Sequence, residues 1–95
     1  MKTFVQYQWD VRKDAGNRRK HGLSLEDGIP ALEDPNGQSW IDDGSHDELR
    51  FATLGMAYPN VLLVITTQPS EEVVRIISVR KAERHEENWY RLGHP

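Results

Sequence analysis

The first candidate site is a basic stretch near the N-terminus. Residues 11–22 hold five Lys or Arg side chains and a single acid. If this stretch is helical, Lys13, Asn17 and His21 lie in one line, with Lys20 beside them. An imidazole has an ordinary pKa of about 6.5 and transfers protons near neutral pH, while ammonium groups attract phosphate. The spacing therefore predicts a phosphate-facing stripe. The alternative is that Lys20 and His21 only stabilise the carboxyl end of the helix.

Three arginines on later, strand-like segments form the second candidate site. Arg50, Arg75 and Arg80 are of interest because guanidinium groups bind phosphate oxygens in pairs and stay charged in a partly dry site. Arg80 stands at the predicted end of a strand, beside Lys81. The alternative is that each arginine only forms an ion pair with an acid. The acids considered for such pairs are Glu48, Glu71 and Glu72.

The segment that follows the first candidate site carries charge of the opposite sign. Residues 23–48 hold eight acids and neither Lys nor Arg, so the net charge of −3 conceals a strong polarity along the chain. A fold that brings the first and last segments together would create a positive field that favours a polyanion. The acidic segment ends in a loop that superficially suggests a metal site, with Asp42, Asp43, His46, Asp47 and Glu48. No metal-ligand spacing is matched, so we predict no metal there. The segment is instead solvated, repels a polyanion or receives a basic arm of a partner.

Four aromatic residues have alternative roles. Trp40, Tyr58, Trp89 and Tyr90 either stack on nucleotide bases or pack in the core or against a protein partner. In so small a domain the second role is favoured. Trp9 is assigned to the core.

The elements that position these residues follow from local signals. Residues 4–9 are rich in aromatic and β-branched types, which predicts a strand. Asp10 is a typical helix N-cap and Gly22 a typical residue after a helix, so a helix is predicted over 11–21.

A second helix, a meander and a third helix are predicted for the rest of the chain. Ser24 and Asp27 open the second helix, which Pro30 keeps short or irregular. Strands are then expected at 38–41, 49–56, 61–67 and 73–80, and a last helix at 81–92. The predicted class is α+β, a small antiparallel sheet with two N-terminal helices and a C-terminal helix, all on one side of the sheet.

Strict alternation along the last strand predicts which side chains share a face. It places Ile76, Ser78 and Arg80 on one face and Arg75 and Val79 on the other.

Length and composition restrict the class of protein. Ninety-five residues predict one domain, 1–95. The longest apolar run has five residues, so no membrane span is expected, and no secretion signal is recognisable. The absence of cysteine excludes disulfides and thiol catalysis and fits a cytoplasmic location.

Several motifs together resemble the BrnT family of ribonuclease toxins from type II toxin–antitoxin modules. The resemblance extends from about Tyr7 to Tyr90. The motifs that carry it are Tyr7-Gln8-Trp9-Asp10, Lys13 with Asn17, Lys20-His21-Gly22-Leu23-Ser24, Asp34-Pro35, Glu48-Leu49-Arg50-Phe51, Leu54-Gly55 and residues 75–82 (RIISVRKA) with Glu86 and Tyr90.

The resemblance implies a RelE-like toxin fold and RNA cleavage without a metal or other cofactor. It also implies neutralisation by a BrnA-type antitoxin and repression of the operon by the complex, which would reach operator DNA only through the antitoxin. Cleavage needs groups that move protons and cations that stabilise the phosphorane. The residues expected to catalyse it are Arg80, Arg50, His21, Lys20 and Lys13. Further RNA contacts are expected from Arg75, Lys81, Asn17, Arg12 and Glu48, the last as a partner that orients Arg50.

Two hypotheses follow. In the first, the chain is an endoribonuclease toxin that inhibits translation and growth. In the second, it is a non-catalytic subunit of a DNA-binding autorepressor complex. The presence of all the basic positions favours the enzyme.

Overall fold

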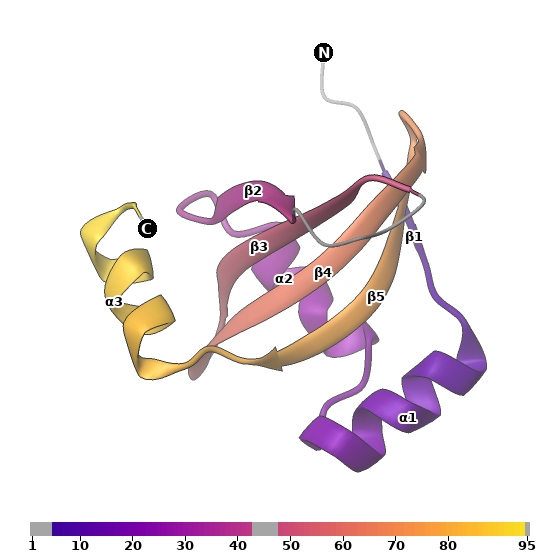
Figure 1. Cartoon of the computed structure of the whole chain (residues 1–95), viewed down its shortest axis with the longest axis horizontal. Helices are drawn as coiled ribbons and strands as arrows, with labels where there is room; N and C mark the ends of the chain where they lie inside the picture. Colours follow the sequence, from indigo (N-terminus) through magenta and orange to yellow (C-terminus); the bar gives the residue numbers. More distant parts are fainter. Residues whose placement is uncertain (1–4, 43–47, 95) are drawn as a thin grey trace.

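The chain folds around one five-stranded sheet with the order β1-β5-β4-β3-β2, as the computed structural model shows for residues 5–42 and 48–94 (Figure 1). The strands are β1 (Gln6–Gln8), β2 (Gln38–Asp42), β3 (Arg50–Ala57), β4 (Asn60–Ser70) and β5 (Val73–Lys81). Strands β3 to β5 form the predicted antiparallel meander, and β2 pairs with β3 as a further antiparallel strand. The prediction of a purely antiparallel sheet is wrong, because β1 pairs with β5 in parallel.

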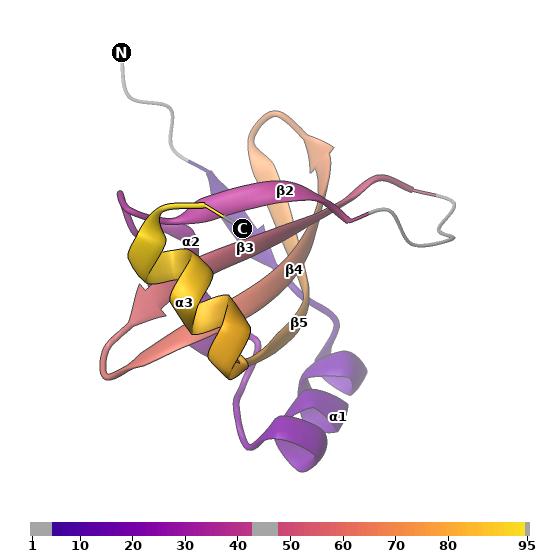
Figure 2. The same cartoon turned by 60° about the vertical axis from the view of Figure 1, so that its left-hand side comes forward.

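The helices lie on both faces of the sheet and along one edge. Helix α1 (Val11–His21) contacts β5, while the short η1 (Glu26–Gly28) and α2 (Ile29–Leu32) pack on one face. Helix α3 (Arg84–Leu92) covers part of the opposite face (Figure 2). The prediction that all helices lie on one side is therefore wrong. Both faces of the sheet carry apolar side chains, and each needs its own cover.

Local capping explains the first two helices. Asp10 accepts hydrogen bonds from the backbone N–H groups of Arg12 and Lys13, and Gly22 ends α1 with a left-handed φ of 72°. Ser24 and Asp27 bond reciprocally, side chain to backbone N–H. These contacts confirm the predicted bounds of α1 and the irregular second helix.

The first core lies between η1, α2 and the sheet. Leu25, Val64, Ile76 and Val79 are fully buried there. Gly55 allows α2 to approach β3, because a Cβ at this position would collide with the carbonyl oxygen of Ala31. A larger residue would push α2 off the sheet.

The second core lies under α3. Leu54 and Leu63 are buried, and Trp89 and Tyr90 of α3 pack against them together with Trp40. Within the described residues, no helix is both long and apolar enough to cross a membrane.

Candidate nucleic-acid interface

Strand register places two of the candidate arginines in one row across the sheet. Gln8 lies opposite Arg75, Arg75 opposite Thr67, and Thr67 opposite Arg50. Directly opposed residues in a sheet point to the same face. The row therefore crosses β1, β5, β4 and β3 on the face that also carries α3, away from η1 and α2.

A β-bulge brings Arg80 onto the same face. Ile65 pairs with Ser78, but its neighbour Thr66 pairs with Ile76, so Ile77 is an extra residue in β5. An extra residue reverses the alternation of all side chains beyond it. Arg80 lies opposite Leu63, whose side chain belongs to the core under α3.

The alternation predicted for the last strand is therefore wrong. Ile76 and Val79 share the first core, although strict alternation placed them on opposite faces. We refer to the surface formed by Arg50, Arg75 and Arg80 as the arginine face.

Arg75 and Arg50 form no ion pair with a carboxylate within the part of the chain that the structure describes, although Asp42 lies opposite Arg50 in the register of β2 and β3. Arg75 donates from Nε and Nη2 to Oε1 of Gln8, at 2.9 and 2.8 Å. The Nε of Arg50 is buried and finds no hydrogen-bond partner among the described residues, nor does the buried Oγ1 of Thr67. Unsatisfied buried donors are costly, and here two neighbouring residues of the row each retain one.

Sequence analysis did not single out Thr67. A threonine in an apolar strand is unremarkable until its register with two arginines is known. The predicted alternative of ion pairs with Glu71 or Glu72 is not found for Arg50 or Arg75 in the described residues.

Arg80 differs from the other two arginines because a carboxylate holds it. Its Nη1 and Nη2 donate to the two carboxylate oxygens of Glu86, at 2.8 and 3.0 Å. Glu83 lies 3.8 Å from the same guanidinium. The partner is none of the three acids proposed from the sequence.

The pairing of Arg80 with Glu86 also shifts the pKa values of both side chains. Burial disfavours the charged form of Glu86, but the hydrogen bonds from Arg80 and from the backbone N–H of Glu83 outweigh it, and the pKa of Glu86 is lowered. The hydrogen bonds to Glu86 likewise raise the pKa of Arg80. Arg80 thus joins the end of β5 to the start of α3.

Helix α1 runs alongside β5 in the same direction. Lys13, in its first turn, lines a pocket of about 320 Å³ with Arg75 and Ile77. Asn17, one turn later, binds the backbone of Val79, and His21 follows one further turn on, on the same side of the helix. The predicted line of residues therefore lies along the edge of β5. Arg12 and Lys20 are exposed on the same helix, and Lys81 is exposed at the end of β5.

Asn17 has a different role from the predicted one. Its side-chain amide donates to the carbonyl oxygens of Val79 and Leu23, and its Oδ1 accepts from the N–H of Val79. The residue is only 7% exposed. Asn17 thus satisfies the edge of β5 beyond the end of β1, and its side-chain amide is occupied by this structural contact.

The aromatic residues divide between packing and exposure. Trp40 and Trp89 pack edge to face, with ring centroids 6.2 Å apart, as part of the second core. The hydroxyl of Tyr90 donates to Asp34, which also accepts from the N–H of Met56. Tyr58 is 91% exposed.

His85 is a second imidazole that sequence analysis passed over. It lies in the first turn of α3 with its ring centroid 4.9 Å from that of Trp89. Its charge contributes to the lowered pKa of Glu86, the partner of Arg80. In the sequence, the only feature that could have drawn attention to His85 is that it stands next to Glu86.

The remaining predicted residues lie at the acidic loop. Glu48 is exposed, and no contact with Arg50 is found in the described part of the chain, so the proposed orienting pair is not formed. Asp43, His46 and Asp47 lie outside the described residues. Among the residues that are described, no group of three His, Asp or Glu side chains is arranged to hold a metal ion.

Comparison with known proteins places the chain in a family. Residues 9–86 match the family of BrnT ribonuclease toxins of type II toxin–antitoxin systems. The chain belongs to the BrnT family.

A solved structure supports the same assignment at the level of the fold. The 1.1 Å crystal structure of the BrnT ribonuclease toxin of Brucella abortus is similar, with a TM-score of 0.59 and 23% sequence identity. The match covers 88% of this chain and 100% of the Brucella chain. No curated protein sequence gave a significant match. As a BrnT-family protein, the chain is a ribonuclease toxin of a type II toxin–antitoxin system.

Proposed function

We propose that this BrnT-family chain cuts RNA on its arginine face without a metal ion, and that the loss of RNA inhibits translation and growth. In such a cut the 2′-oxygen of a ribose bonds to phosphorus while the bond to the 5′-oxygen breaks. One group takes the proton of the 2′-hydroxyl, another gives a proton to the departing oxygen, and cations stabilise the doubly negative phosphorane.

One observation carries this proposal. Arg50 and Arg75 flank Thr67 in a single row, and neither guanidinium forms an ion pair with a carboxylate in the described residues. Guanidinium groups held on strands bind the oxygens of one phosphate without first breaking an ion pair. Arg80 is proposed to contact the RNA further along β5, from the position in which Glu86 holds it.

The proton-transfer groups are proposed to come from α1. His21 carries an imidazole, the side-chain type best suited to transfer protons near neutral pH, and Lys13 and Lys20 supply positive charge beside it. The direction of α1 along β5 supports this, since it leads from the pocket of Lys13 and Arg75 towards the end of the strand. His85 on α3 is the competing imidazole. Arg12 and Lys81 are proposed as outlying contacts to the RNA backbone.

The partners follow from the same assignment. We propose a BrnA-type antitoxin, repression of the operon by the complex through the antitoxin, action in the cytoplasm and a RelE-like fold. A type II system implies a protein antitoxin.

Two experiments test the proposed activity. The first induces the chain alone in a bacterial host and follows growth and total RNA. The second digests RNA with the purified chain in the presence of EDTA. Growth arrest with RNA loss, and cleavage that survives EDTA, are expected. Parallel His21→Ala and His85→Ala variants identify the imidazole that transfers protons. Only the substitution that removes this imidazole should slow cleavage, by about 100-fold.

Intact RNA and normal growth with a folded protein would contradict the proposal. That result would favour the alternative, a non-catalytic subunit of a DNA-binding autorepressor complex.

A further inference from the structure

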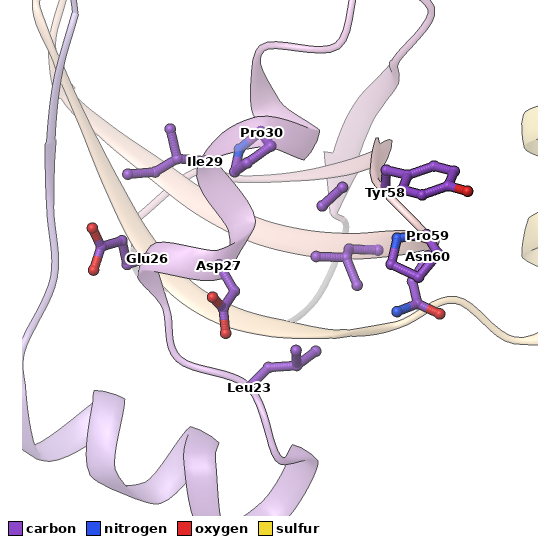
Figure 3. Close-up of a pocket in the computed structure, with 10 residues that line it drawn as sticks. Leu23, Glu26, Asp27, Ile29, Pro30, Tyr58, Pro59 and Asn60 are labelled. Atoms are coloured by element: carbon purple, nitrogen blue, oxygen red, sulfur yellow. The ribbon is translucent and has the colours of Figure 1, made fainter.

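A groove of about 600 Å³ opens on the face of the sheet opposite the arginines (Figure 3). Leu23, Ile29 and Leu62 line it with apolar side chains. The turn between β3 and β4 forms another wall, with Tyr58 and Pro59. Leu62 belongs to the first core, so the groove continues that core to the surface.

The charge of this groove is negative. Glu26 and Asp27 line it, and the groove lining contains neither Lys nor Arg. Asp27 is engaged by the backbone N–H of Ser24, whereas Glu26 is exposed and its carboxylate forms no hydrogen bond or ion pair with any described residue. A phosphate backbone would be repelled here, while a Lys or Arg side chain would be attracted.

Tyr58 makes the groove suited to a protein chain. Its side chain is 91% exposed beside an apolar cavity. Tyrosine is among the residue types that contribute most to protein interfaces, because it buries a large apolar ring while its hydroxyl stays hydrogen-bonded. An apolar cavity with an aromatic at its edge and acids at its rim is complementary to a segment with apolar and basic side chains.

We infer that this groove docks the antitoxin, through a segment of the antitoxin in which Lys or Arg side chains accompany apolar ones. The inference rests on the proposed function, because it assigns a place on the chain to the antitoxin. We refer to this surface as the docking groove. A segment seated in it lies on the opposite face of the sheet from Arg50 and Arg75.

Cross-linking tests this assignment directly. The chain has no cysteine, so a Tyr58→Cys substitution provides a single thiol to which a benzophenone can be attached. The matched control is Val11→Cys, another strongly exposed residue, 79% exposed, outside the groove. Each labelled chain is purified with the antitoxin encoded beside it and irradiated. We expect the antitoxin to cross-link at position 58 and not at position 11. Cross-linking at 11 alone, at neither position, or of RNA at 58 would overturn the inference.

Affinity provides a second test that does not depend on RNA cleavage. Glu26→Lys reverses a charge at the groove, and Glu71→Lys makes the same change at an exposed acid outside it. We expect the Kd for the purified antitoxin to rise at least tenfold in Glu26→Lys and less than twofold in Glu71→Lys, with thermal midpoints equal to that of the unchanged chain. Equal Kd values for the two variants, or no antitoxin binding by the unchanged chain, would overturn the inference. If the unchanged chain binds antitoxin but fails to cut RNA, the cleavage proposal fails while the docking groove is still tested.

Discussion

The arginine face and the docking groove lie on opposite faces of one sheet and differ in how they are built. Strand register assembles the arginine face, because it brings Arg50 and Arg75 together although they are far apart in the sequence. The docking groove comes mainly from η1, α2 and the β3–β4 turn. One face carries two guanidinium groups, of Arg50 and Arg75, that form no ion pair with a described residue, and the other carries carboxylates and exposed apolar surface. The net charge of −3 therefore describes neither of the two surfaces. Substitutions in the arginine face and in the docking groove should have separate effects.

The largest expected effect concerns the arginine face. Arg50→Ala and Arg75→Ala should each lower the rate of RNA cleavage in EDTA by at least about 100-fold, because a positioned donor to the phosphorane is lost. The thermal midpoint and the antitoxin affinity should stay unchanged, since neither arginine forms an ion pair with a described residue. Arg18→Ala, which removes an exposed cation paired with Asp14, is the control and should cut normally. A full rate in both sheet variants would remove the arginine face from the account.

The next effect concerns the face that carries the docking groove. Gly55→Ala should lower the free energy of unfolding by about 3 kcal/mol or more, because the new methyl group collides with the backbone of Ala31 in α2. Urea denaturation measures this change. Gly16→Ala is the matched control. It lies in α1, where the nearest atom to its Cβ is 3.9 Å away, and it should stabilise the chain by about 0.5–1 kcal/mol. Similar stabilities for the two variants would show that α2 is not pressed against β3.

A smaller effect distinguishes Arg80 from the other two arginines. Glu86→Gln should lower the free energy of unfolding by about 2 kcal/mol, because Arg80 loses a charged hydrogen-bond partner. Glu86 is only 5% exposed, so water cannot replace this partner. Glu87→Gln, the exposed neighbour, should cost nothing measurable by thermal unfolding. Equal midpoints for both variants would mean that the pair does not hold α3 in place.

The smallest effect is a dependence on pH. Burial opposes ionisation of Asp34 and Glu86, but their hydrogen bonds outweigh it and lower the pKa of both carboxyls in the folded chain. The unfolded chain therefore takes up these protons at a higher pH than the folded chain does. The resulting stability is complete at neutral pH and is lost as the pH falls below about 4. Thermal midpoints between pH 7 and 3 should show this loss, and Glu86→Gln should reduce it. Midpoints that rise on acidification would contradict it.

Short-range signals predicted the elements well. The caps at Asp10 and Gly22 define α1 without reference to the rest of the fold, and the structure confirms both bounds. The meander from β3 to β5 was likewise predicted from strand-forming residues and turns.

Features that depend on pairing between distant segments were not predictable. The bulge at Ile77 exists only in relation to β4, and it decides whether Arg75 and Arg80 share a face. Asn17 looked like a ligand residue on a basic helix, because its burial against the edge of β5 has no local signal. The pair of Arg80 with Glu86 crosses the connection between β5 and α3, so helical spacing did not suggest it.

The most direct test of the account measures RNA cleavage and antitoxin affinity on the same two variants. Arg75→Ala and Glu26→Lys are compared with the unchanged chain, with circular dichroism as the control for folding. The account predicts that Arg75→Ala loses cleavage and keeps its affinity for the antitoxin, whereas Glu26→Lys keeps cleavage and loses affinity. If either folded variant lost both properties, the arginine face and the docking groove would not be separate sites, and the account would be contradicted.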